Sequence, residues 1–270
     1  MKVFIDTADI NEIKEINSYG ILDGVTTNPS LIKKASEKYK IKSFEEYIKK
    51  ILKLCKGKPV SLEVVGSTYE DMVNEGKTLF KKFNPVAKNV YIKIPVNPCM
   101  DDKCDVSGGI KAIKELSKNG IPINCTLIFT PEQDLLAAKA GAKMVSPFAG
   151  RIDDYIREKN KFKFKKEDYF PAEGLKKGGK ILGDSGIVSG VDLVEKIALI
   201  FDNDNIKCKI LAASIRNNQQ FREVAEAGAD IATVPYEVIK SLLNHYKTKE
   251  GMKQFTRDVI PKYSKILKHK

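Results

Sequence analysis

Short apolar segments with strand character recur along the whole chain, and an amphipathic helical stretch follows each of them. Because strand and helix alternate eight times, the pattern predicts a single (β/α)8 TIM barrel, with a doubly wound open sheet as the alternative. Capping-box spacings such as SFEE and STYE mark helix starts, and glycines such as Gly141 and Gly228 mark helix ends. The eight predicted strands span residues 3–6, 24–28, 60–65, 90–96, 123–129, 143–148, 209–214 and 230–235.

We expect one domain over residues 1–270, because no stretch of the chain has the composition of an interdomain linker. Two long connections interrupt the strand and helix pattern. Residues 97–109 form a polar loop after the fourth strand, and residues 155–186 form a basic, aromatic loop between the sixth strand and its helix. Loops of this length in compact domains are commonly lids or binding loops. The helical tail, residues 248–270, has an apolar face that needs a surface to pack on, such as a neighbouring subunit.

The composition is 42% hydrophobic and 30% charged, which is typical of a globular protein. No apolar run reaches the roughly 18 residues needed to span a membrane, and the first residues do not resemble a signal peptide. Five scattered cysteines predict reduced thiols and a cytoplasmic location. The net charge of +12 leaves a nucleic-acid partner as an alternative, but the lysines mostly lie singly beside acids. We therefore expect a solvated basic surface, without a nucleic-acid or membrane partner.

The segment VYIKIPV, residues 90–96, reads as a buried strand with a lysine at its centre. Side chains alternate between the two faces of a strand, so Lys93 points away from its apolar neighbours and into the barrel. Polar residues of the other strands have the same parity and lie near the carboxyl ends, where barrel active sites are built. These residues are Asp6, Thr26, Asn28, Ser61, Glu63, Asn124, Thr126, Ser146 and Ser214.

A buried lysine favours the neutral amine, which is a nucleophile able to form a Schiff base with a ketone or aldehyde. Asp6 and Glu63 are carboxylates that could move protons during cleavage of an adjacent carbon-carbon bond. Asn28 and Thr126 could orient hydroxyl groups or a water. The alternative for Lys93 is a buried ion pair that only stabilises the barrel.

A second group of residues has the chemistry of a phosphate site. Arg151, Ser214 and Arg216 follow the sixth and seventh strands, and arginine offers a planar fork of donors to phosphate oxygens. Phosphate sites after the late strands are common in barrels. The alternative is surface salt bridging, for example between Arg151 and Asp153 or Asp154.

Seven segments of the chain resemble the transaldolase family, particularly its short bacterial and archaeal branch, which includes the fructose-6-phosphate aldolases. They are FIDTAD, GVTTNPSLI, SLEV, YIKIPV, NCTLIF, SPFAGRIDD and LAASIRN. The resemblance implies a Schiff-base transferase of the pentose phosphate pathway that needs no metal or organic cofactor. It would transfer dihydroxyacetone from sedoheptulose 7-phosphate to glyceraldehyde 3-phosphate, giving erythrose 4-phosphate and fructose 6-phosphate. It also implies a homo-oligomer, a pentamer or a decamer.

The resemblance assigns a role to each predicted site residue. Lys93 would form the Schiff base, and Asp6 would act as acid and base on the sugar hydroxyl. Glu63 and Thr126 would hold the water that carries protons. The remaining residues would bind the substrate: Asn28 its dihydroxyacetone hydroxyls, Arg151, Ser214 and Arg216 its phosphate, and Ser146 and Phe148 as lining of the pocket.

The main competing activity is an aldolase that uses free dihydroxyacetone. The aldolases of this family resemble the chain but carry glutamine at the position of Glu63 and tyrosine at that of Phe148, so both residues favour the transferase. Two further classes stay open: a silent barrel that only binds sugar phosphates, and a nucleic-acid-associated protein. The spacing of Cys99 and Cys104 is weak support for a metal, so we expect none. Both long loops look expanded relative to compact members of the family, which bears on substrate access.

Overall fold

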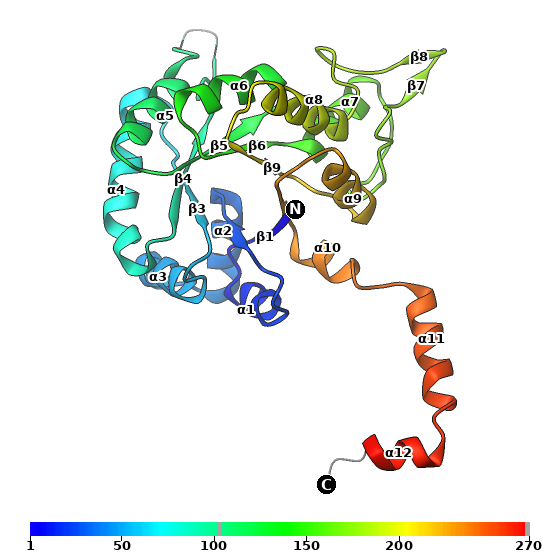
Figure 1. The fold of residues 1–270 in the computed structure, drawn as a ribbon. Helices are drawn as coiled ribbons and strands as arrows, with labels where there is room; N and C mark the ends of the chain where they lie inside the picture. Colours follow the sequence, from blue (N-terminus) through cyan, green and yellow to red (C-terminus); the bar gives the residue numbers. More distant parts are fainter. Residues whose placement is uncertain (102–103, 268–270) are drawn as a thin grey trace.

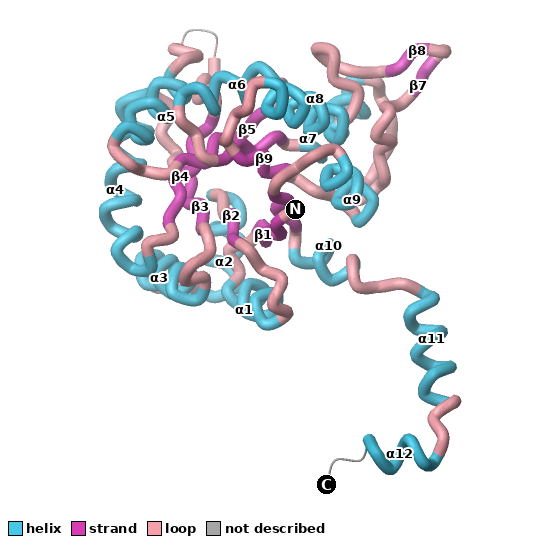
Figure 2. Tube along the Cα trace, in the orientation of Figure 1, coloured by secondary structure: helices cyan, strands magenta, loops and turns pink. Residues whose placement is uncertain are grey.

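Eight parallel strands form a closed barrel in the computed structural model, which describes residues 1–101 and 104–267 (Figures 1 and 2). Around the barrel the strands follow the order β1, β10, β9, β6, β5, β4, β3, β2. The predicted (β/α)8 barrel is therefore confirmed, and the open sheet is excluded. The barrel strands are β1 (Lys2–Asp6), β2 (Gly24–Thr26), β3 (Val60–Glu63), β4 (Val90–Pro95), β5 (Ile123–Ile128), β6 (Met144–Pro147), β9 (Lys209–Ala212) and β10 (Ile231–Val234).

Helices surround the barrel, as Figure 2 shows. Polar side chains cap their first turns; Thr130 makes a complete capping box with Gln133, and Ser43 accepts a hydrogen bond from the backbone N–H of Glu46. Gly141 ends its helix in the left-handed conformation, with φ of 110°. The helices are α1 (Ile10–Ser18), α2 (Pro29–Tyr39), α3 (Phe44–Leu54), α4 (Tyr69–Ala87), α5 (Gly108–Lys118), α6 (Pro131–Ala140), α7 (Ala149–Lys159), α8 (Gly190–Asn203), α9 (Asn218–Glu226) and α10 (Tyr236–Ser241).

The hydrophobic core lies mainly between the barrel and its helices. Outward-facing strand residues such as Ile5 and Ile92 belong to this large cluster, and burial of their apolar surface drives the closure of the fold. A smaller cluster, formed by Phe4, Met144, Leu211, Ala213 and Ile231, contains the inward-facing residues of the strands. The other inward-facing positions, near the carboxyl ends of the strands, carry mostly polar side chains, as the alternation predicts.

The long connection after the sixth strand starts later than the sequence suggests. Helix α7 follows β6 directly and continues to Lys159, so the predicted loop 155–186 begins as helix and lies after α7, not before it. Ile152 and Ile156 explain this difference, because they are one turn apart and both buried against the core. The irregular segment, residues 160–189, contains a two-stranded antiparallel sheet of β7 (Lys176–Lys177) and β8 (Lys180–Ile181).

The tail leaves the barrel after α10 and extends away from it (Figure 1). It contains α11 (Tyr246–Arg257) and α12 (Pro261–Leu267), in which none of the described residues is buried. The predicted interruption at Pro261 is confirmed, because this proline begins the second helix. None of the described helices is both long and apolar enough to cross a membrane.

The cysteines differ from the expectation of five reduced thiols. Cys99 and Cys104 form a disulfide in the exposed loop after β4, with their Cα atoms 5.6 Å apart. The two cysteines are five positions apart in sequence, and their Cα separation is within the range that a disulfide spans. Cys55, Cys125 and Cys208 are free and buried.

Candidate active site

A cavity of about 180 Å³ opens at the carboxyl ends of the barrel strands. Eight of the ten site residues predicted from the sequence line it: Asp6, Asn28, Lys93, Ser146, Phe148, Arg151, Ser214 and Arg216. Glu63 does not line the cavity but contacts Lys93 from the neighbouring strand. Thr126 does not line it either; it lies on β5, the strand on the other side of β4.

Lys93 lies in β4 with only 5% of its surface exposed. Its Nζ is 3.1 Å from Oε2 of Glu63, and it donates a hydrogen bond to the backbone carbonyl of Thr27 at 3.3 Å. The strand register places Glu63 directly opposite Lys93, so the pairing of β3 with β4 sets this contact. The site therefore holds an amine together with a carboxylate able to exchange a proton with it.

Asp6 ends β1 on the opposite side of the cavity. Its Oδ1 accepts a hydrogen bond of 2.7 Å from the hydroxyl of Thr26, which is in turn 2.6 Å from the hydroxyl of Thr233. Burial raises the pKa of Asp6, and the positive charge of Lys93 opposes this rise. Our sequence reasoning missed Thr233, although the alternation in DIATVP places this residue on the inward face of the last strand.

A chain of side-chain hydrogen bonds crosses the barrel beside Lys93. Ser146 donates to Oδ1 of Asn124 at 2.7 Å, and the amide nitrogen of Asn124 donates to the hydroxyl of Ser61 at 3.2 Å. By contrast, Oγ1 of Thr126 is buried and has no hydrogen-bond partner among the described residues. Asn28 uses its amide oxygen to cap α2, which leaves its NH₂ group for other partners.

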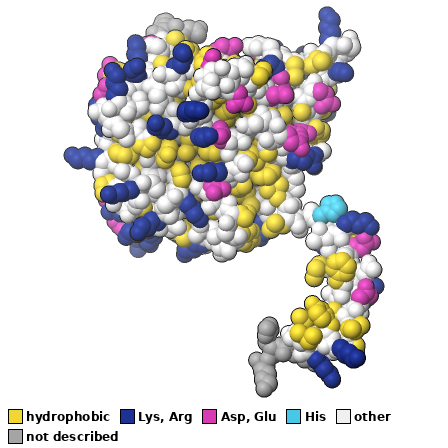
Figure 3. Space-filling model, viewed as in Figure 1, with side chains coloured by type: hydrophobic (Ala, Val, Ile, Leu, Met, Phe, Trp, Pro, Cys, Tyr) yellow, Lys and Arg dark blue, Asp and Glu magenta, His cyan; other side chains and the backbone are white. Residues whose placement is uncertain are grey.

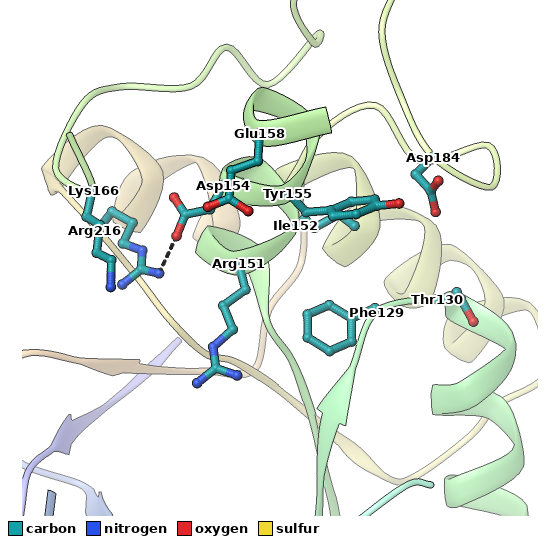
Figure 4. Close-up of a pocket in the computed structure, with 10 residues that line it drawn as sticks. All are labelled: Phe129, Thr130, Arg151, Ile152, Asp154, Tyr155, Glu158, Lys166, Asp184 and Arg216. Carbon is teal, nitrogen blue, oxygen red and sulfur yellow. Dashed lines mark hydrogen bonds and ion pairs between the residues drawn. The ribbon is translucent and has the colours of Figure 1, made fainter. Parts of the chain in front are cut away.

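The predicted phosphate residues meet where α7 begins and β9 ends. Arg216 makes an ion pair of 2.6 Å with Asp154, shown as the dashed line in Figure 4. The guanidinium of Arg151 lies 5.0 Å from the ring centre of Phe148. The alternative of salt bridging therefore holds for Arg216, whereas no ion pair of Arg151 with Asp153 or Asp154 occurs among the described residues. Ser214 lines the cavity from a left-handed backbone conformation, with φ of 62°.

Glycine at position 150 makes this arrangement possible. A Cβ atom there would lie 2.0 Å from the carbonyl oxygen of Ser214 and 2.6 Å from Nε of Arg216. Asp153, the other acid considered for Arg151, accepts instead from the backbone N–H of Gly190 and from Gln220, each at 2.7 Å. It therefore joins α7 to the helices that follow.

A second cavity, of about 560 Å³, is lined by the residues drawn in Figure 4, and we call it the outer cavity. Arg151, Lys166 and Arg216 line both cavities, so the two are neighbours. Lys166 and Asp184 come from segment 160–189. Sequence reasoning did not single out Lys166, because seven lysines in this segment look alike without the fold. No group of three or more metal-ligating side chains occurs in the part of the chain that the structure describes.

A family model described as transaldolase/fructose-6-phosphate aldolase matches residues 3–269. The chain belongs to this family. A probable transaldolase of Thermoplasma acidophilum is 42% identical over 258 residues, covering 96% of this chain and 95% of the relative. Probable transaldolases of Chlorobium phaeobacteroides and Petrotoga mobilis are each 40% identical, covering 96% and 100% of this chain and 97% and 99% of the respective relative. The family resemblance and the transferase class predicted from the sequence are confirmed.

Proposed function

We propose that this protein is a transaldolase of the pentose phosphate pathway that transfers a dihydroxyacetone unit through a Schiff base on Lys93. The donor is sedoheptulose 7-phosphate and the acceptor is glyceraldehyde 3-phosphate. The observation that carries the proposal is the contact of 3.1 Å between the buried amine of Lys93 and the carboxylate of Glu63. A site that only bound sugar phosphates would need neither group.

The reaction begins when the neutral amine of Lys93 attacks the ketone carbon of the donor. Glu63 moves protons as the resulting carbinolamine loses water and becomes an iminium ion. Thr126 has a buried hydroxyl with no hydrogen-bond partner in residues 1–101 and 104–267, which supports a role in holding the water involved. Asp6 then removes the proton of the C4 hydroxyl, and the C3–C4 bond breaks to release erythrose 4-phosphate. The electron pair of that bond remains on the Lys93 adduct as an enamine.

The second half of the reaction reverses these steps. The enamine carbon attacks the aldehyde of glyceraldehyde 3-phosphate, and Asp6 returns its proton to the new hydroxyl. Hydrolysis of the iminium then frees fructose 6-phosphate and Lys93. The raised pKa of Asp6 suits a group that must both accept and return a proton. We assign the phosphate to Arg151, Ser214 and Arg216, the dihydroxyacetone hydroxyls to Asn28, and the adjoining wall to Ser146 and Phe148.

A coupled assay tests the reaction. The protein should consume fructose 6-phosphate only when erythrose 4-phosphate is supplied, and borohydride should trap a covalent adduct at Lys93. Lys93→Met should abolish both turnover and trapping. An adduct at another lysine would refute the mechanism, and release of free dihydroxyacetone without an acceptor would indicate the aldolase instead. Glu63 and Phe148 disfavour that second activity.

We also propose that the protein is a homo-oligomer, a pentamer or a decamer, in which the tail packs on a neighbouring copy. The tail exposes large apolar side chains, with Phe255 70% and Ile266 76% accessible (Figure 3). An apolar face of this kind is stable when another surface covers it. We propose a cytoplasmic location; the three free cysteines support it, and the Cys99–Cys104 disulfide is the observation against it. A thiol count on protein from intact cells would test this.

A further inference from the structure

Lys166 lies at the boundary between the two cavities, on a segment that comes from outside the eight strand and helix units. It lines both cavities together with Arg151 and Arg216, and Figure 4 places it on the same side of the outer cavity as Arg216. Lysine side chains on a long loop are usually solvated and variable in position. The contacts of this segment show that the backbone carrying Lys166 is held in place.

Arg157, on the last turns of α7, holds the segment from below. It is 5% exposed, and its guanidinium donates to the carbonyl oxygens of Asp168 at 3.1 Å and Tyr169 at 2.7 Å. The same guanidinium lies 5.0 Å from the ring centre of Phe164 and 4.9 Å from that of Phe170. Arg157 thus uses its N–H groups to bind two carbonyl oxygens and contacts two aromatic rings, and these contacts anchor residues on either side of Lys166.

The turn that contains Lys166 is closed by its own hydrogen bonds. The backbone N–H of Lys165 donates to the Asp168 carboxylate at 2.8 Å, and the backbone N–H of Asp168 donates to the carbonyl of Lys165 at 3.0 Å. The side chain of Asn217 donates to the carbonyl of Glu167 at 3.1 Å. Because Asn217 follows Arg216 in sequence, this bond joins the turn to the loop that carries the predicted phosphate residue.

The charges at this boundary are unequal. Asp154 neutralises Arg216, whereas neither a hydrogen bond nor an ion pair engages the amine of Lys166 within residues 1–101 and 104–267. Lys166 lines the inner cavity together with Arg151 and Arg216, and Asp6 is the only acidic residue among the described residues that line it. These cations favour an anion in that cavity. Lysine serves such a site as a point charge, while the arginines supply directed hydrogen bonds.

We propose that Lys166 is a third cation for the substrate phosphate and determines preference for phosphorylated over unphosphorylated acceptors. This inference rests on the proposed sugar-phosphate activity and extends it to a residue of segment 160–189. The segment then acts as a fixed extension of the phosphate site.

The test compares Lys166→Gln with Lys165→Gln, a matched control on the same turn whose side chain lines neither cavity. Lys166→Gln should raise KM for glyceraldehyde 3-phosphate about fivefold, as expected from loss of one partly exposed charge interaction. It should leave KM for unphosphorylated glyceraldehyde unchanged. Lys166→Arg should restore most of the preference, and Lys165→Gln should behave as the wild type.

Calorimetric titration with inorganic phosphate provides a readout that does not depend on turnover, so it separates this inference from the proposed function. The dissociation constant of phosphate should rise about fivefold in Lys166→Gln, again from loss of one charge interaction. An unchanged constant, no phosphate binding by the wild type, or equal increases in both KM values would overturn the proposal. Absence of transaldolase turnover with the expected phosphate result would instead reject only the activity.

Discussion

Several ionisable residues of this barrel are buried, and burial makes their charged forms costly in free energy. Lys93 and Glu63 share one buried contact, and Asp6 lies nearby with a raised pKa. Asp134 is fully buried on α6, and neither of its carboxylate oxygens has a hydrogen-bond partner among the described residues. The first three belong to the site, so their cost is linked to reactivity. Asp134 lies outside it and makes a different prediction.

Glu63→Gln should lower transaldolase turnover by roughly 100-fold or more, because an amide cannot carry protons to and from the carbinolamine. The measurement is kcat in the coupled assay, with circular dichroism to confirm folding. Glu115→Gln is a suitable control, since it makes the same substitution at a glutamate that pairs with a lysine, Lys77, outside the site. Turnover within twofold of the wild type would show that Glu63 only balances the lysine charge.

Asp134 predicts a pH dependence of stability. Burial raises its pKa well above the ordinary 3.8, so in the folded chain it stays protonated where the unfolded chain ionises. The folded state then binds more protons, and the contribution of Asp134 to the free energy of unfolding falls as pH rises above about 4, by about 1.4 kcal/mol per pH unit. Asp134→Asn mimics the protonated acid and lacks this term. Urea unfolding between pH 4 and 7 should therefore show the variant gaining stability relative to the wild type; parallel curves would contradict this.

Three elements of the fold meet closely at the proposed phosphate site. The first turn of α7 touches the chain after β9. The backbone of Gly150 lies so close to Ser214 that there is no room for a Cβ atom between them. Segment 160–189 then returns to the same place and is fastened there by Arg157 and Asn217. The position of the two arginines thus depends on how three segments pack, and not on one strand alone.

Gly150→Ala should displace either α7 or the Ser214 backbone, because a Cβ atom would lie 2.0 Å from a carbonyl oxygen. We expect a loss of about 1–3 kcal/mol in the free energy of unfolding and a larger rise in KM for phosphorylated than for unphosphorylated substrates. Gly251→Ala in α11 is the matched control, since nothing lies within 4 Å of its added Cβ. Equal behaviour of the two variants would contradict the close approach.

Part of this element arrangement could be predicted from the sequence. Alternation along VYIKIPV identified which side chains face inward, because period two follows from strand geometry alone. In β9 the predicted parity was wrong, because Leu211 and Ala213 belong to the inner cluster and Ala212 to the outer one. The ion pair between Arg216 and Asp154 could not be predicted, since Arg151 is nearer to Asp154 in sequence. The position of Lys166 could not be predicted either, because it depends on the contacts that Arg157 makes with residues on both sides of it. Contacts between distant segments have no periodic signal.

At the scale of the whole molecule, the tail is the part that the barrel does not use. Its two helices contain no buried residue among those described, yet both expose large apolar side chains (Figure 3). The proposed oligomer would cover this surface. Barrel stability should then depend little on the tail, whereas association should depend on it strongly.

A double substitution, Phe255→Asp with Ile260→Asp, should convert the oligomer to a monomer at micromolar concentration, because two carboxylates cannot be buried in an apolar contact without partners. Multi-angle light scattering gives the mass directly. Gln254→Asp, which adds a charge to the same helix, serves as control and should keep the wild-type mass. A wild-type chain that is already monomeric, or a double variant that stays assembled, would count against the proposed contact.

The closing pair of strands has a consequence for chain connectivity. β1 pairs with β10 in parallel register, with Lys2 opposite Ile231 and Ile5 opposite Val234. The first and last strands are therefore neighbours. The closed barrel itself does not depend on which of its eight units comes first in the sequence. A circular permutant, with a linker from the end of α10 to the start of β1 and new termini in the turn between β7 and β8, should assemble the same active site.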